Sequence, residues 1–192
     1  SYQGADWLEE YNKQFDACSA EDWHSYVYWR RKPFEGKYIN IDNKGLRKTI
    51  YTIEEAVRQK PVKKIFMFGG STMWGSGIRD EFTIPSLVGS DLAKQSIHAE
   101  VTNFGESGYV STQEMTELFL QLREGNIPDL VVLYDGANDV FSAYQQGKSG
   151  IPQNENNREK EFNTLRSKKR ALMVFFESLK TLSTVKFITG LI

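Results

Sequence analysis

Three short apolar runs, each followed by a small, polar and glycine-rich segment, constrain the fold of this chain more than any other feature. The runs are residues 63–68 (KKIFMF), 99–104 (AEVTNF) and 128–134 (PDLVVLY). Helical patterns lie between them, over residues 83–95 and from residue 111 onward. Short buried strands that alternate with helices of this length favour a parallel sheet with helices on both faces. We therefore predict an α/β fold for this part of the chain.

The two helical segments have recognisable start signals. Thr83 can cap the first helix, and Pro85 is tolerated in its first turn. In the second helix, Ser111 and Glu114 have the spacing of a capping box. Its apolar residues follow the i, i+3, i+4, i+7 rule, which predicts a helix with one buried face. That face comprises Met115, Leu118, Phe119 and Leu122.

The texture of the sequence changes near residue 60, and we predict that residues 1–60 form an N-terminal extension packed on a main domain, residues 61–192. Residues 5–30 have helical stretches rich in Trp and Tyr, and residues 37–51 predict a hairpin that turns at Asp42-Asn43-Lys44-Gly45. We interpret the aromatic cluster of the extension as packing, with a platform for sugar stacking as the alternative. The cluster comprises Trp23, Tyr26, Tyr28 and Trp29.

Beyond residue 145 the pattern weakens. Residues 145–160 are polar and contain glycines and a proline, which predicts an exposed loop leading into a helix over about residues 160–182. The loop is either a solvated excursion or a lid over a site. Residues 183–192 are at best a weak fourth strand.

Composition excludes several classes of function. The net charge is -1 at pH 7, with basic and acidic residues interspersed, so we predict no nucleic-acid partner. The single cysteine, Cys18, rules out an internal disulfide and a cysteine-rich metal site, and we predict neither a metal nor a cofactor. No apolar stretch reaches the ~18 residues that cross a bilayer, which predicts a soluble chain without a membrane span. The first residue is not Met, which leaves open a removed N-terminal anchor and an extracytoplasmic location; the compartment itself stays undetermined.

Ligands of open parallel sheets bind outside the carboxyl ends of the strands, where the three glycine-rich segments lie. They are residues 69–72 (GGST), 103–108 (NFGESG) and 135–139 (DGAND). The first segment lacks the Gly-Lys-Ser/Thr of a Walker loop and the spacing of a dinucleotide fingerprint, and Met73 replaces the last glycine of a G-x-S-x-G elbow. Ser71, directly after a buried strand, is then a nucleophile or a helix cap.

Together, the three segments resemble the first three sequence blocks of the SGNH hydrolases, also called GDSL esterases and lipases. Ser71 matches the serine block, Gly108 the glycine block and Asn138 the G-x-N-D block. The resemblance implies a flavodoxin-like three-layer α/β/α fold and ester hydrolysis or acyl transfer, with a small or carbohydrate-linked acyl ester as substrate. It also implies that Ser71 is the nucleophile, and that the oxyanion donors are the backbone N–H groups of Ser71 and Gly108 and the amide of Asn138. Gly70 departs from the pattern, because the family usually has Asp there.

The base that a serine nucleophile needs is not evident. The chain has two histidines. His98 precedes the second strand, at the amino end of the sheet, and His24 lies in the extension, so neither is placed to serve Ser71. The D-x-x-H block of the family is absent, and only its first three central strands are identifiable. We expect Asp139 to brace its loop rather than to touch substrate.

Three interpretations stay open. The chain is the N-terminal portion of a longer protein whose C-terminal segment supplies the base, or a pseudoenzyme that binds a ligand, or a protein whose base comes from another chain. In each case we expect an apolar surface at the unfilled edge of the sheet, covered by a missing segment or by self-association.

Overall fold

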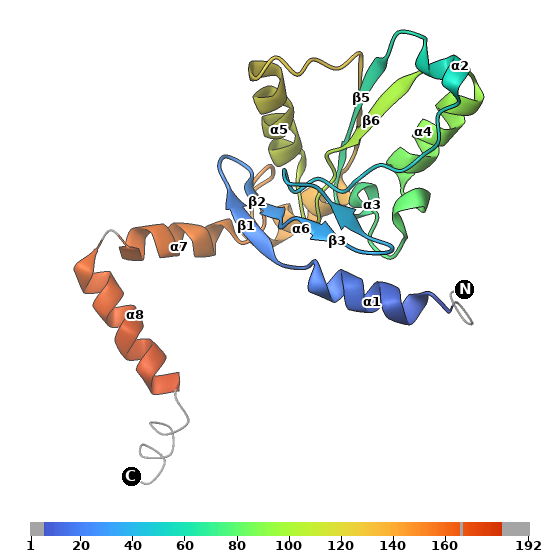
Figure 1. The fold of residues 1–192 in the computed structure, drawn as a ribbon. Helices are drawn as coiled ribbons and strands as arrows, with labels where there is room; N and C mark the ends of the chain where they lie inside the picture. Colours follow the sequence, from blue (N-terminus) through green and yellow to red (C-terminus); the bar gives the residue numbers. More distant parts are fainter. Residues whose placement is uncertain (1–5, 166, 182–192) are drawn as a thin grey trace. The chain divides into compact units, whose positions relative to one another are not determined.

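The structure is a computed structural model of the 192-residue chain, and it describes residues 6–165 and 167–181. The chain divides into two units, residues 1–153 and 154–192, which are described separately. The first unit contains a parallel three-stranded sheet with helices, so the α/β prediction is confirmed (Figure 1).

The central sheet has the strand order β6-β5-β7, and both pairings are parallel. β5 spans Lys63–Gly69, β6 spans Ala99–Asn103 and β7 spans Leu130–Tyr134. In register, Phe66 lies opposite Thr102 on one side and Val131 on the other. These strands coincide with the three apolar runs, because a short run bounded by glycines is long enough for a strand and too short for a helix. Their carboxyl ends share one edge of the sheet.

Helices cover both faces of this sheet, as Figure 1 shows. After β5 come α3 (Ser71–Trp74) and α4 (Ile84–Lys94), after β6 comes α5 (Ser111–Arg123), and after β7 comes α6 (Ala137–Gln146). α4 packs against the face of β5 that includes Ile65 and Met67. Leu118 of α5 packs against the opposite face, with Phe66 and Phe68. The arrangement is an α/β/α sandwich, as expected.

The start of α4 was predicted correctly and the start of α5 was not. Thr83 caps α4, where its hydroxyl oxygen accepts a hydrogen bond from the Ser86 N–H, and Pro85 lies in the first turn. α5 begins instead with Val110 as its N-cap, whose N–H donates to the side chain of Gln113 at 3.2 Å. Glu114 does not complete a capping box, because its side chain is buried.

The predicted buried face of α5 is also wrong. Only Leu118 of the expected apolar stripe is packed, and the other three residues, Met115, Phe119 and Leu122, are exposed. The buried residues of α5 are largely polar, because they meet polar groups of the N-terminal extension. The Gln113 amide donates to the Val27 carbonyl at 2.7 Å, and Glu117 forms an ion pair with Arg30 at 3.4 Å.

The N-terminal segment is only partly helical. α1 spans Leu8–Ala17, but β1 (Glu21–His24) and β2 (Tyr28–Arg31) form an antiparallel hairpin, so the prediction of helix through residue 30 is wrong. Aromatic residues favour strands, and Asp22 lies opposite Arg30 across the hairpin, which supports the pairing.

The turn at residues 42–45 is confirmed. β3 (Phe34–Glu35) pairs with β4 (Asn40–Ile41), and the chain then reverses. The N–H of Asp42 donates to the Leu46 carbonyl at 2.9 Å, and Gly45 has a φ of 78°, a left-handed conformation that favours glycine. The short helix α2 (Glu55–Arg58) follows before β5.

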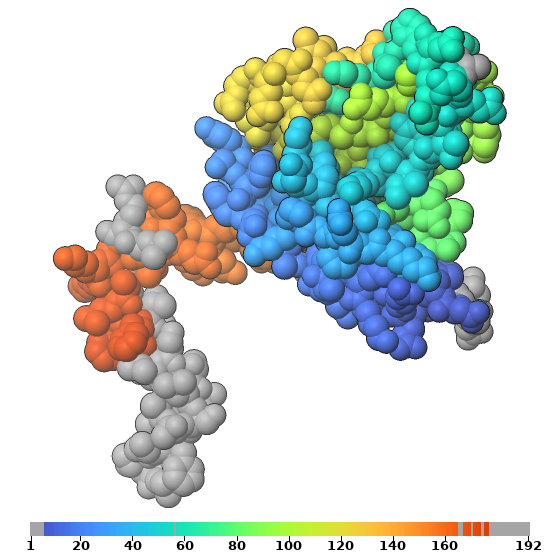
Figure 2. Space-filling view, viewed as in Figure 1, coloured from blue at the N-terminus to red at the C-terminus, as the bar shows by residue number. Residues whose placement is uncertain are grey.

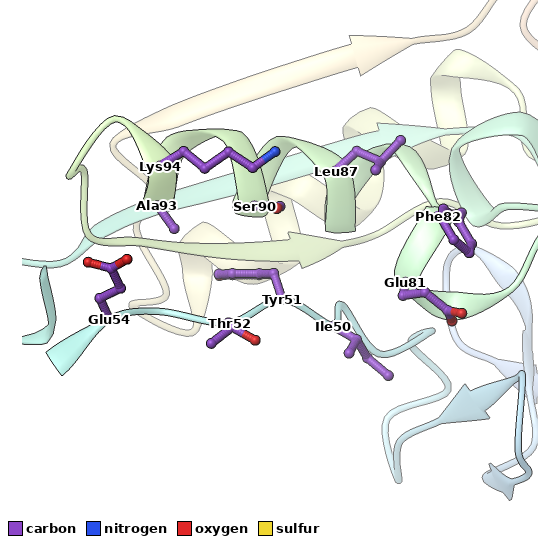
Figure 3. Close-up of a pocket in the computed structure, with 10 residues that line it drawn as sticks. All are labelled: Ile50, Tyr51, Thr52, Glu54, Glu81, Phe82, Leu87, Ser90, Ala93 and Lys94. Atoms are coloured by element: carbon purple, nitrogen blue, oxygen red, sulfur yellow. The ribbon is translucent and has the colours of Figure 1, made fainter.

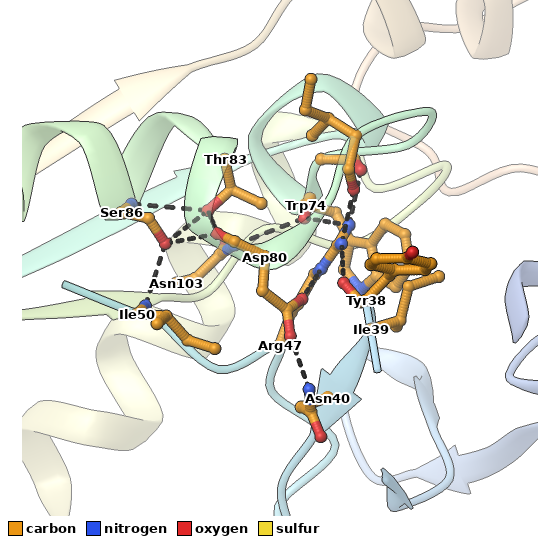
Figure 4. A network of polar contacts seen from close by, with 12 residues as sticks. Tyr38, Ile39, Asn40, Arg47, Ile50, Trp74, Asp80, Thr83, Ser86 and Asn103 are labelled. Atoms are coloured by element: carbon orange, nitrogen blue, oxygen red, sulfur yellow. Dashed lines mark hydrogen bonds and ion pairs between the residues drawn. The ribbon is translucent and has the colours of Figure 1, made fainter. Parts of the chain in front are cut away.

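A buried polar network ties the extension to the sheet (Figure 4). Arg47 forms an ion pair with Asp80 at 2.7 Å and also donates to the Ile78 carbonyl at 2.6 Å. The Asn40 amide donates to the second oxygen of Asp80 at 2.9 Å. Because both charges are buried and hydrogen-bonded, removal of either one leaves an uncompensated charge in the interior. In Figure 2 the extension, coloured blue to cyan, covers a broad part of the first unit. A boundary near residue 60 stays a prediction.

The second unit consists of α7 (Glu155–Leu165) and α8 (Lys168–Thr181). The prediction of one continuous helix over residues 160–182 is therefore wrong. Ser167 lies between the two helices, where its carbonyl accepts the first bond of α8, from the Ala171 N–H. Serine favours such a position because its side chain competes for backbone bonds. The weak fourth strand, residues 183–192, lies outside the described residues. In the part of the chain that the structure describes, no helix has the length and apolar character to span a membrane.

Candidate active site

The three glycine-rich loops converge at the carboxyl edge of the sheet. Ser71 is the first residue of α3, directly after β5, and Asn138 lies in the first turn of α6, directly after β7. The Asn138 Nδ2 donates to the Tyr109 carbonyl at 2.8 Å. The same nitrogen would lie only 2.4 Å from a Cβ placed on Gly70. The Asn138 amide therefore lies between the residue before Ser71 and the residue after Gly108.

Two of the three hydrogen-bond donors that the family resemblance assigns to an oxyanion, the backbone N–H groups of Ser71 and Gly108, are not used elsewhere among the described residues. Among the hydrogen bonds of the described residues, none involves the backbone N–H of Ser71, that of Gly108, or the Ser71 hydroxyl. The Asn138 amide has two hydrogens, and its bond to Tyr109 uses one of them. The edge of the sheet thus presents free donors on both loops that flank Asn138.

Two glycines of the site serve different purposes. Gly108 has a φ of 80°, and a Cβ there would approach Trp29 no closer than 3.5 Å. The left-handed backbone conformation therefore favours glycine at 108. At Gly70 the φ is ordinary, but a Cβ would meet the Asn138 amide at 2.4 Å and could be accommodated only if that side chain moved. The departure at Gly70 from the family pattern therefore has a local steric reason.

The N-terminal hairpin supports the loop of Gly108. The Trp29 indole N–H donates to the Ser107 carbonyl at 3.1 Å, and Arg31 forms an ion pair with Glu106 at 3.4 Å. Burial raises the pKa of the Glu106 carboxyl, although Arg30 and Arg31 oppose the shift. The hairpin thus holds this loop by side-chain contacts from outside the sheet.

The aromatic residues of the extension differ in how far they are buried. Trp29 packs with Val27 and Tyr109, as predicted for a core residue. Trp23 and Tyr26 are exposed, and the ring of Trp23 stacks on that of Tyr28 at 5.4 Å. Packing therefore explains Trp29, and the exposed rings leave the sugar platform as a prediction.

Asp139 braces its loop, as predicted. Its carboxylate accepts hydrogen bonds from the Ser111 N–H at 3.1 Å and from the Ser111 hydroxyl at 2.5 Å. These bonds join the first turn of α5 to the first turn of α6. Asn138 is therefore the neighbour of a residue, Asp139, that is bonded to α5.

The polar loop between α6 and α7, residues 147–154, begins beside the site. The Ser142 hydroxyl donates to the Ile151 carbonyl, and the Gln153 side-chain oxygen would lie 3.6 Å from a Cβ on Gly108. This part of the loop is thus attached to the first unit and is not a free excursion. A role as a lid stays a prediction.

Neither histidine forms a hydrogen bond with Ser71. The His98 ring contacts the Lys60 carbonyl at 2.8 Å, and its own carbonyl accepts from the Lys63 N–H, which places it at the amino end of the sheet as expected. His24 lies exposed in β1. Within residues 6–165 and 167–181 the Ser71 hydroxyl therefore has no bonded base.

A pocket is lined by residues that do not belong to these loops (Figure 3). This pocket, of about 520 Å³, lies between α4 and the segment before α2. Its Tyr51 hydroxyl is engaged with β6, since it donates to the Ala99 carbonyl at 2.7 Å and accepts from the Val101 N–H at 3.1 Å. In the described part of the chain, no group of three or more His, Cys, Asp or Glu side chains is placed to hold a metal ion. The strand-end loops therefore remain the candidate site.

Comparison with known proteins gives matches among solved structures alone. No protein-family model matches the chain. No curated protein matches it either. The crystal structure of AlinE4, an SGNH-hydrolase family esterase, matches with 24% identity over 47% of this chain and 47% of that one, at a TM-score of 0.40. Two mutants of esterase AlinE4 match with 24% and 23% identity, each at the same coverage and TM-score.

This chain spans about half the length of the solved structures that it matches. The function proposed below rests on the geometry of the three loops instead of on these matches. The chain is similar, over about half of its length, to AlinE4, an SGNH-hydrolase family esterase, and to two of its mutants.

Proposed function

We propose that this chain provides the nucleophile and the oxyanion-binding groups of an SGNH-type serine esterase that acts on a small or carbohydrate-linked acyl ester. The main support is the position of the Asn138 amide, against Gly70 on one side and bonded to Tyr109 on the other. The amide has a second hydrogen, and the N–H groups of Ser71 and Gly108 have no hydrogen-bond partner among the described residues. Such a set of donors suits a developing negative charge on oxygen.

The reaction follows from these groups. The Ser71 Oγ attacks the acyl carbon and its proton passes to a base, while the carbonyl oxygen becomes an oxyanion held by the three donors. The bond to the alcohol oxygen then breaks, the alcohol takes up the proton, and the acyl group stays on Ser71. Water releases it as a carboxylic acid, whereas a second alcohol in place of water would make the protein an acyltransferase. One such donor lowers the activation free energy by roughly 3 to 4 kcal/mol.

A non-catalytic ligand-binding domain is the alternative, and one observation favours it. The Ser71 hydroxyl has no bonded base among the described residues. A chain with donors and no base binds anions without turning over esters. We therefore expect the 192-residue chain to hydrolyse p-nitrophenyl acetate no faster than its Ser71→Ala variant.

The site itself is tested by a ligand that needs no base. Methylphosphonate mimics the tetrahedral oxyanion, and in a ¹⁵N NMR titration we expect it to shift the backbone signals of Ser71 and Gly108 and the side-chain amide of Asn138. Asn138→Ala should weaken its binding about 10-fold or more, in line with the loss of one donor to a charged oxygen. Asn126→Ala is the matched control and should bind normally, because the Asn126 amide donates to Gln121 near the end of α5 and, in the described part of the chain, forms no hydrogen bond with the three loops.

Two results would overturn the proposal. Shifts that map to the pocket beside Tyr51, or nowhere, would remove the oxyanion site. Robust ester hydrolysis that is lost on substitution of His24 or His98 would show that the base is present and has been misplaced.

A further inference from the structure

Glu114 is a buried carboxyl that the proposed reaction does not use. It lies in the first turn of α5 and is 0% exposed. Neither of its side-chain oxygens accepts a hydrogen bond from any described residue. A carboxylate buried without donors loses its hydration and gains nothing in return, so the ionised form is strongly disfavoured there.

The groups that face Glu114 add to this effect. Asp135, in the loop between β7 and α6, raises the pKa of the Glu114 carboxyl through its charge and through a side-chain hydrogen bond, and the charge of Asp139 of α6 adds to the effect. Arg30 of β2 is the cation that acts on Glu114, but its effect is the smallest, and it also forms an ion pair with Glu117. Two carboxyls in reach of each other can hydrogen-bond only if one of them is protonated.

We propose that Glu114 keeps a proton which it donates to Asp135, and that this carboxyl pair is a positioning device for the loop that bears Asn138. The proposed bond joins the first turn of α5 to Asp135, and the bonds from Ser111 join the same turn to Asp139. Asn138 lies between Asp135 and Asp139 in the sequence. The inference rests on the proposed function in that it takes Asn138 as an oxyanion donor.

The titration of Glu114 agrees with this geometry. Burial, followed by the charge of Asp135, raises the pKa of Glu114 from 4.5 to about 8. The folded protein thus binds this proton more tightly than the unfolded chain does. The stabilisation is complete below about pH 4.5 and is lost as the pH rises through about 8. Above that pH, the carboxylates of Glu114, Asp135 and Asp139 repel one another and the loop loosens.

The test follows the full chain by NMR from about pH 5 to pH 9, a range that spans both protonation states. In the wild type we expect one side-chain carboxyl carbon to titrate near pH 8, and the side-chain amide signals of Asn138 to move with the same midpoint. Glu114→Gln, which keeps a neutral donor of the same shape, should remove both transitions and leave the Asn138 signals at their low-pH positions. Glu124→Gln, at the exposed end of the same helix, should leave both transitions intact.

The outcomes are separable from those of the proposed function, because none of these signals depends on ester turnover or on methylphosphonate binding. A Glu114 titration near its ordinary pH, or a transition that survives in Glu114→Gln, overturns the shared proton. A Glu114 transition near pH 8 with Asn138 signals that stay constant overturns the positioning role. If Glu114→Ala folds, its Asn138 signals should resemble those of the high-pH wild type, since the donor to Asp135 is gone.

Discussion

The two sides of β5 differ sharply in how well they are covered. On the β6 side, Val101 is 4% exposed, and α4 packs over Ile65 and Met67. On the β7 side, Leu133 is 46% exposed, and the Tyr144 ring on α6 is 91% exposed. The sheet is thus covered by packed side chains on the β6 side and is exposed on the β7 side, which is the open side. A parallel strand normally has neighbours and helices on both sides, so β7 shows which part of this fold the described residues leave uncovered.

Several apolar side chains of β7 and of the helices α5 and α6 are exposed. They comprise Leu130, Leu133, Tyr134, Met115, Phe119, Leu122, Val140, Phe141 and Tyr144. This confirms, for the described residues, the apolar surface expected at an unfilled sheet edge. Exposed apolar surface of this kind marks an interaction site or an aggregation hazard. What covers it stays a prediction, and the substitutions below test the contrast between the two sides.

The largest effect is expected on the covered side, at the buried pair of Arg47 and Asp80. Arg47→Ala leaves the Asp80 carboxylate buried without its cation and removes a donor to three or more groups around α3. We expect a loss of about 3 to 5 kcal/mol in the free energy of unfolding, measured by urea denaturation. Lys48→Ala is the matched control, because the ion pair of Lys48 with Glu35 is exposed, and it should change stability by less than about 1 kcal/mol. Equal effects of the two substitutions would mean that the buried network does not stabilise the fold.

A smaller effect on stability is expected where the three loops meet. Substitutions of the adjacent Gly69 and Gly70 distinguish a clash with the backbone from a clash with a side chain. A Cβ on Gly69 would lie 2.5 Å from the Tyr134 carbonyl oxygen, which belongs to the backbone of β7 and cannot move without the strand. A Cβ on Gly70 meets the end of the Asn138 side chain, which can rotate away. Gly69→Ala should therefore cost about 1 to 3 kcal/mol of stability.

Gly70→Ala should leave stability nearly unchanged and weaken methylphosphonate binding, because the amide that rotates away is the proposed donor. Urea denaturation and the NMR titration measure the two effects. A Gly70→Ala protein that binds as the wild type does would show that Asn138 need not lie against Gly70.

These contrasts also show what the sequence could predict. The strand after Lys63 and the Thr83 cap depend on residues close together in the chain, and both were predicted. The hairpin that contains Arg30 and the burial of Glu114 were missed, because each depends on a partner far along the sequence. Buried Arg30 is stabilised by its ion pair with Glu117 and by a hydrogen bond to the Phe104 carbonyl, and no local pattern shows these distant partners.

The candidate site also combines local features, which could be predicted, with features that depend on distant residues, which could not. The placement of Ser71, Gly108 and Asn138 at one edge could be predicted, because short motifs at the ends of parallel strands occupy one edge of the sheet. The steric role of Gly70 could not, because it depends on the rotamer of Asn138. An unpaired buried carboxyl at Glu114 could not be predicted either, since its spacing to Ser111 was that of an ordinary capping box.

The smallest effect on stability, and the clearest test of the open side, concerns Phe119 and Phe141. Both rings are exposed, so Phe119→Ser and Phe141→Ser should change the free energy of unfolding by no more than about 0.5 kcal/mol. If the open side associates with a second copy of the chain, these substitutions should raise the concentration at which sedimentation velocity detects dimers. Leu87→Ser, at an exposed apolar position of α4 on the covered side, is the matched control and should leave association unchanged. Variants that associate as the wild type does would show that the apolar surface of α5 and α6 is not where copies meet, and a loss of stability well above this bound would show that these rings are packed in solution.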